Sequence, residues 1–141
     1  MSNANVNPAI RAVLVDELAP AVHATGDHET AGIDMGLFET ALYCAAVGAF
    51  GAGATAEIQL EQATTAAFTD AKALRDPVDL VASTPVQISL RSDELDVNGG
   101  FRFVRAVLSN ATQTVTAGIV GLGLNARYQP AAPLTGTIVA G

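Results

Sequence analysis

The sequence predicts an all-β protein, an antiparallel β-sandwich of the jelly-roll kind, formed by a single domain over residues 1–141. Three observations lead to this prediction. Short segments that alternate between apolar and polar residues recur along the chain with turn sequences between them, and helical periodicity is almost missing. Half of the residues are hydrophobic, but tryptophan is absent and alanine and valine dominate. Such small side chains suit the packing of one sheet on another.

The beginning of the chain is expected to be an arm followed by a strand. Residues 1–9 show no core pattern and are expected to form an extended N-terminal arm. Residues 10–18 fit a helix, because Ile10, Leu14 and Leu18 are four apart, and they equally fit a short strand over 12–15. We favour the strand, because the segments downstream have β character, and we expect Pro20 to end it.

The middle of the chain is expected to alternate between strands and turns. We expect a polar turn at 25–30, a short strand at 31–34, a strand of small residues at 38–47 and a glycine-rich hairpin loop at 48–53. The clearest strands are 55–62 and 86–91, where apolar residues alternate with polar ones and predict one buried and one exposed face. Residues 69–75 between them predict a single helical turn or an irregular segment.

Residues 98–130 predict a long β-hairpin that ends in a strand of small residues. Its first strand has apolar residues on both faces, which indicates cover on both sides, as in a sandwich or at a subunit interface. Residues 110–113 supply the turn. The returning strand carries Gly118, Gly121 and Gly123, and glycines inside a strand indicate a bend or the close approach of another backbone.

The charge composition points to assembly and away from nucleic acid. Only 15% of residues are charged, the net charge is −7, and Lys72 is the only lysine. A chain with so little charge favours a permanent oligomer over a free monomer. Without a basic stripe no nucleic-acid partner is expected, and Arg102 and Arg105 are spaced to face opposite sides of a strand.

Membrane and secretion signals are also missing from the sequence. No apolar run reaches the roughly 18–20 residues of a membrane span, so no membrane partner is expected. The first residues lack the basic and apolar regions of a signal peptide.

One polar cluster carries metal-ligating atoms: His23, Asp27, His28, Glu29 and Asp34. His23 and His28 are placed to converge across the expected turn. The cluster matches no defined metal motif, and we interpret it as a solvated polar turn that binds no metal. Cys44, the only cysteine, lies in an apolar run and is interpreted as a small buried hydrophobic residue.

The remaining candidates do not form a catalytic pattern. Glu57 and Glu61 are about 13 Å apart on an extended strand, beyond the roughly 5–9.5 Å of a glycosidase pair. Asp93, Glu94 and Asp96 lack the loop of a dedicated calcium site. The serines at 83, 89, 92 and 109 lack a nucleophile motif. We therefore expect a protein that is not an enzyme, with no catalytic residues, no metal and no cofactor.

A series of short motifs runs from Leu18 to Pro133. They are residues 18–21, 32–34, 38–41, 47–48, 68–70, 100–107 and 121–128 with Pro130. In this order they resemble a family of small virion structural proteins of tailed bacteriophages, in which an aromatic-Val-Arg strand precedes a Leu-Gly-x-x-Arg-Tyr/His ending. This chain departs from the family in its glycine- and alanine-rich loop and in its longer apolar tail.

The resemblance implies a capsid decoration (cement) protein that binds the outer surface of the phage head as a trimer and stabilises it. The implied partners are the major capsid protein and further copies of the chain. The implied location is the capsid surface of the virion, after synthesis in the bacterial cytoplasm. A head-completion, head–tail or tail protein is the alternative, and a carbohydrate-binding β-sandwich is the third hypothesis. We also expect residues 1–9 and 129–141 to cross onto adjacent subunits.

Overall fold

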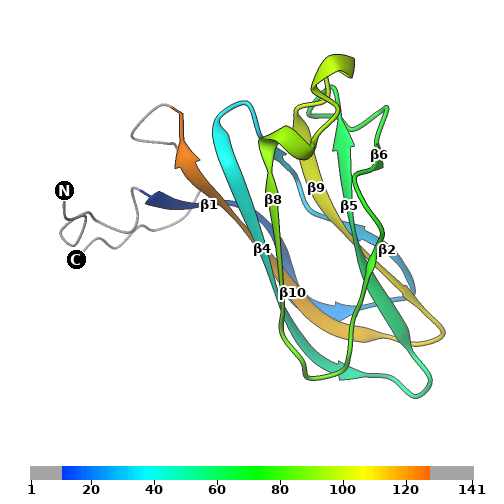
Figure 1. The fold of residues 1–141 in the computed structure, drawn as a ribbon. Coiled ribbons are helices and arrows are strands. Elements are labelled where there is room, and N and C mark those ends of the chain that lie inside the picture. Colours follow the sequence, from blue (N-terminus) through cyan, green and yellow to red (C-terminus); the bar gives the residue numbers. More distant parts are fainter. Residues whose placement is uncertain (1–10, 128–141) are drawn as a thin grey trace.

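Ten strands form two antiparallel sheets in the computed structural model, which describes residues 11–127. Sheet A has the order β1 (Ala12–His23), β10 (Val115–Ala126), β4 (Phe38–Phe50) and β8 (Val86–Arg91). Sheet B has the order β2 (Gly26–Glu29), β9 (Phe103–Ala111), β5 (Thr55–Ala63) and β6 (Lys72–Ala73). Two short strands complete sheet B, β3 (Ile33–Asp34) beside β9 and β7 (Val78–Asp79) beside β5. The sheets pack face to face (Figure 1), which confirms the predicted all-β sandwich.

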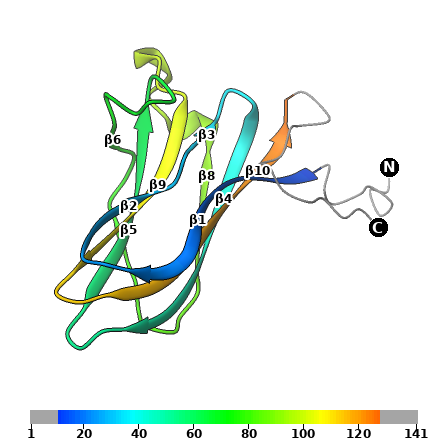
Figure 2. The ribbon, with the colours of Figure 1, turned by 180° about the vertical axis from the view of Figure 1, so that it is seen from behind.

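The strands pair in a nested order, first with last. β1 pairs with β10, β2 and β3 pair with β9, β4 pairs with β8, and β5 pairs with β6 and β7. Two further pairings, β10 with β4 and β9 with β5, join these pairs into the two sheets. Most connections therefore pass from one sheet to the other, as Figure 2 shows for β1 and β2. This winding of a long antiparallel ribbon is the jelly roll that the sequence predicts.

Both predicted hairpins, 98–130 and the one around the loop 48–53, are wrong, because in each case the two strands belong to different sheets. β9 belongs to sheet B and β10 to sheet A, although residues 112–114 alone separate them. The glycine-rich loop likewise carries the chain from β4 in sheet A to β5 in sheet B. The two loops lie side by side at one end of the sandwich, where Gly51 N donates a hydrogen bond to Thr114 O at 2.8 Å. Alternation sets which side of a strand is buried, but not which strand it pairs with.

The expected strand over residues 10–18 is confirmed, but its end is not at Pro20. β1 continues to His23 through a register shift between Leu18 and Ala21, and a bulge of this kind tolerates a residue without an N–H. The expected polar turn at 25–30 is also wrong, because Gly26–Glu29 form the edge strand β2. Charged side chains on an edge strand hide the apolar alternation that would reveal it.

The other segments match their predictions closely. β5 and β8 show the expected alternation: their inner apolar positions are buried or half-buried, and the polar residues between them are half-buried in β5 and exposed in β8. Residues 69–75 are irregular apart from β6. The segment that carries Asp93, Glu94 and Asp96, the acidic turn, contains two 3-10 helices, η1 (Ser92–Glu94) and η2 (Val97–Gly99). The two expected arms, 1–9 and 129–141, lie outside the described residues.

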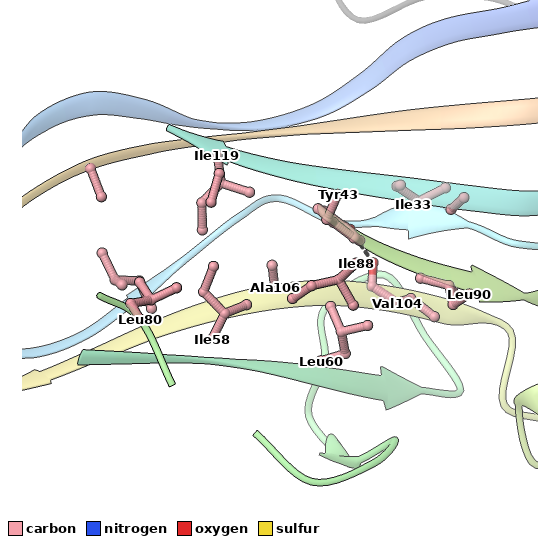
Figure 3. Packing of buried hydrophobic residues seen from close by; sticks show 14 of the residues in the cluster. Ile33, Tyr43, Ile58, Leu60, Leu80, Ile88, Leu90, Val104, Ala106 and Ile119 are labelled. Atoms are coloured by element: carbon pink, nitrogen blue, oxygen red, sulfur yellow. Dashed lines mark hydrogen bonds between the residues drawn. The ribbon is translucent and has the colours of Figure 1, made fainter. Parts of the chain in front are cut away.

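The core fills the space between the sheets (Figure 3). Its largest fully buried apolar side chains come from both sheets: Ile33, Tyr43, Ile58, Leu90, Val104, Leu108, Val115 and Ile119, with Met35 just after β3. Two of the three predicted close-approach glycines face this core. A Cβ on Gly121 would lie 2.8 Å from Tyr43 Cε1, and one on Gly123 would lie 2.5 Å from Phe38 Cε1. These glycines make room for the two aromatic rings.

A fully buried carboxylate ties three segments of the chain together. Asp16 on β1 has no exposed surface. Its Oδ2 accepts a hydrogen bond from the Tyr43 hydroxyl at 2.8 Å, and its Oδ1 accepts from Gly32 N at 2.9 Å and Glu17 N at 3.0 Å. Burial, and then the charge of Asp16, raise the pKa of Tyr43 well above its usual value of 10.0. The hydroxyl therefore stays protonated and keeps donating to the carboxylate.

Candidate docking face on sheet A

The two outer faces of the sandwich differ sharply in charge. On sheet B, Arg105 donates to Glu29 Oε2 at 2.8 Å and to Glu61 Oε2 at 2.9 Å, and its guanidinium lies 4.6 Å from the centre of the Phe68 ring. Ser109 donates to Asp27 at 2.6 Å on the same face. These polar and charged groups on β2, β9 and β5 satisfy one another, so this face is compatible with exposure to solvent.

Sheet A presents apolar side chains outward instead. Because Ile119 and Gly121 of β10 face the core, the residues between and after them, Val120 and Leu122, face outward. Leu122 lies opposite Leu14 of β1 on one side and opposite Leu42 of β4 on the other. Leu14 is 41% exposed and Val120 is 39% exposed. A row of apolar side chains therefore crosses three strands on the outside of the sheet.

Charged residues are rare on the central strands of sheet A. β10 has none and β4 has one, Glu39. The central strands of sheet B, β9 and β5, carry Arg105, Glu57 and Glu61. Exposed apolar surface that is poor in charge is typical of faces that contact proteins, membranes or ligands.

A hollow of about 360 Å³ is set into this face. Its floor and walls come from all four strands of sheet A and the residue before β8, and they include Leu18, Pro20, Cys44, Ala46, Pro85, Val86, Gly118 and Val120. Gly118 lets the bulge of β1 lie close to β10, since a Cβ there would be 2.9 Å from the Cα of Pro20. Glu17 and Gln87 supply polar groups to the lining, which is otherwise apolar.

Cys44 lies in this hollow and not in the core. It follows the inward-facing Tyr43 on β4, so its side chain points to the outer face, where it is half-buried. The expectation that Cys44 is a small buried residue is therefore wrong, because its side chain is half-buried on the outer face. The alternation along 38–47 carries the signal for this, once it is known that Tyr43 faces inward.

The predicted polar cluster is only partly brought together. The rings of His23 and His28 do converge, with their centres 4.7 Å apart. Their Nε2 atoms, however, donate to backbone carbonyls, that of His23 to Ala117 O at 3.0 Å and that of His28 to Ala24 O at 2.7 Å. The three carboxylates go elsewhere, to Ser109, Arg105 and Arg102. In residues 11–127 there is no group of three or more metal-ligating side chains arranged to hold an ion.

The other candidate carboxylates do not converge on a common partner. Glu61 binds Arg105, while Glu57 lies on a neighbouring part of β5 opposite Asp79. In the acidic turn, Asp93 pairs with Arg91, Glu94 with Arg75 and Asp96 with Lys72. The hydrogen bond from Lys72, followed by one from Gly99 N, lowers the pKa of Asp96. The acidic side chains thus hold the surface loops in place and do not converge on one point.

The serines do not form a nucleophile–base pair in the part of the chain that is described. Ser109 donates to Asp27, and Ser92 accepts a hydrogen bond from Arg127 at 3.1 Å. Neither histidine has a serine hydroxyl among its hydrogen-bond partners within the described ranges. Sequence reasoning did not identify the docking face as a unit, although one residue that it singled out, Cys44, lies in the hollow of this face.

Comparisons of this chain with protein-family models, with curated proteins and with solved structures find no match. Within residues 11–127, the helical turns are too short and too polar to cross a bilayer.

Proposed function

We propose that this protein is a structural assembly subunit, a decoration (cement) protein that binds the outer surface of a tailed-phage head as a trimer and stabilises it. The observation that supports an assembly role is the apolar, charge-poor outer face of sheet A. The assignment to a phage head rests on the sequence motifs between Leu18 and Pro133. The proposed partners are further copies of the chain and the major capsid protein.

The contrast between the two faces supports an orientation in which sheet A contacts other proteins and sheet B faces solvent. The outer face of sheet B satisfies its own charges through Arg105 and its two carboxylates, so it loses nothing by staying in water. The outer face of sheet A gains by being covered. Burying an exposed aliphatic side chain such as Leu14 or Val120 contributes at most about 1.5–3 kcal/mol, and the costs of association reduce this sum. Because a shell repeats the contact many times, even a small net free-energy gain per contact would stabilise the shell.

The first experiment locates the protein in the virion. Cryo-electron microscopy of the particles is expected to show it as protrusions on the head, in hundreds of copies. A location restricted to the tail or neck, with a few to tens of copies per particle, would replace the proposal by the head-completion or tail alternative.

The second experiment tests the docking face itself. Purified protein is added to shells that lack it, and both binding and the temperature of shell disruption are measured. The Val120→Asp variant places a charge in the hollow of sheet A and is expected to reduce binding at least tenfold. Val97→Asp is the matched control, because it makes the same substitution at a valine that is 65% exposed and lies outside sheet A, in η2 between β8 and β9. Equal binding by both variants would show that the outer face of sheet A takes no part in the assembly, neither between copies nor with the shell.

A further inference from the structure

We infer that the hollow on the outer face of sheet A receives residues 133–139 of a neighbouring copy, so that the subunits are linked by exchanged C-terminal segments. This inference deepens the self-assembly part of the proposed function and rests on it. It does not depend on the identity of the shell, because it concerns contacts between copies of one purified chain.

The hollow has the chemistry of a site for aliphatic side chains. Its volume is about 360 Å³, and Val120, Cys44 and Ala46 line it together with two prolines. A closed apolar cavity of about 150 Å³ in a protein holds one benzene molecule, so this hollow has room for roughly two aliphatic side chains. It is open to the outside, and its lining contains no basic group that would call for an acidic partner.

The chain that follows the described part has the matching chemistry. Residues 128–141 contain no charged side chain, and they include Leu134, Ile138 and Val139. An uncharged segment loses little when it leaves water, whereas each charged group would add a desolvation cost. Residues 128–141 lie outside the described part of the structure, so their expected crossing onto an adjacent subunit stays a prediction. The hollow on sheet A is a site that could receive them.

The strand geometry favours a neighbouring copy over the same molecule. Val120 lines the hollow, and Arg127 lies seven residues further along the chain, about 23 Å away at strand rise. Leu134 is a further seven residues on, so a straight return of Leu134 to Val120 would use the whole length and leave none for the reversal. Ile138 and Val139 have four and five more residues and could return to their own hollow, so the cross-linking test below has to separate the two sources. A proline also disfavours helical backbone at the residue before it, and this stretch of sequence contains Pro130 and Pro133. A segment that continues away from the end of β10 meets another subunit without reversing.

The single native cysteine allows a direct test of this contact. Cys44 lines the hollow, so an Ile138→Cys substitution places a second thiol in the segment that is proposed to fill it. A disulfide requires Cα atoms about 4.4–6.8 Å apart, and only a seated segment brings them that close. After mild oxidation, we expect non-reducing gels to show bands at multiples of the monomer mass, with most of the protein cross-linked.

Two control variants make the cross-link specific. Val97→Cys, which places the second thiol on the exposed η2 turn, is expected to give less than a tenth as much cross-linked product. Ile138→Cys combined with Cys44→Ser removes the acceptor thiol and is expected to abolish the Cys44-dependent bands. In the chain without residues 130–141, Cys44 is expected to react with a soluble thiol reagent at least tenfold faster than in the full chain.

The outcomes separate this inference from the proposed function. A disulfide formed only within one chain would overturn the exchange between copies and replace it by a self-covering segment. No cross-link in a protein that still forms oligomers would overturn the inference and leave the assembly role standing. Cross-linked oligomers that do not bind phage shells would support the exchange and refute the capsid assignment.

Discussion

Replacing Tyr43 by phenylalanine tests whether the buried hydrogen bond to Asp16 stabilises the fold. The Tyr43→Phe change removes one oxygen atom and keeps the ring that packs against Gly121. Asp16 then keeps its two backbone donors, Gly32 N at 2.9 Å and Glu17 N at 3.0 Å, but loses the hydroxyl at 2.8 Å. The carboxylate oxygen Oδ2 is left without that donor in a site with no exposed surface.

The expected loss of unfolding free energy is about 2 kcal/mol at neutral pH. A hydrogen bond to a charged group contributes roughly 1.5–3 kcal/mol, and the buried acceptor left behind adds its own desolvation penalty. Loss of the weaker contact between the hydroxyl and Val104 O, at 3.3 Å, adds to this in the same direction. No cavity term applies, because the ring is retained.

Urea unfolding at pH 7 measures this loss. With a slope of roughly 2 kcal/mol per molar urea, the midpoint is expected to fall by about 1 M. Ser109→Ala is the matched control, because it removes the same kind of hydroxyl–carboxylate bond at an exposed site, and it is expected to cost less than about 0.5 kcal/mol. A loss of less than about 0.5 kcal/mol for Tyr43→Phe would refute the argument. A loss above about 4 kcal/mol with a changed slope would instead indicate disrupted packing.

Three further predictions concern pH, packing and surface charge. Because the pKa of Tyr43 is raised in the folded protein, the unfolded chain loses this proton at a lower pH than the folded protein. The free energy of unfolding is therefore retained below about pH 10 and falls above it by about 1.4 kcal/mol per pH unit. Urea titrations at alkaline pH are expected to show this slope in the parent protein and not in Tyr43→Phe. Gly121→Ala, whose Cβ would lie 2.8 Å from Tyr43 Cε1, is expected to cost about 2 kcal/mol and lower the melting temperature by roughly 8 °C, and an unchanged melting temperature would contradict the close approach. Arg105→Ala, which removes a side chain that is 15% exposed and bonded to two carboxylates, is expected to cost about 1–2 kcal/mol. Arg91→Ala, at a pair that is about 70% exposed, is expected to be neutral, and equal losses in the two variants would refute the distinction.

The sequence alone determined the β class and the buried sides of several strands. The alternation in 55–62 and 86–91 is local information, because successive side chains of a strand point to opposite faces whatever the strand pairs with. The glycines at 118, 121 and 123 were also predictable as points of a bend or of close approach, since glycine weakens a strand interior and often marks one of these features. What approaches each of them was not predictable, and it differs: Pro20, Tyr43 and Phe38.

Only the tertiary structure decided which strands are partners and which face is left to contact other proteins. β9 and β10 follow one another closely, yet each pairs with strands far away in the sequence, because inner side chains from both sheets close the core between them. Asp16 looks like an ordinary polar residue of a short strand until Tyr43 and Gly32 meet it from elsewhere. The docking face is likewise a product of tertiary packing. Apolar residues on both sides of β10 are visible in the sequence, but the packing of Ile119 and Gly121 into the core is what turns Val120 and Leu122 outward.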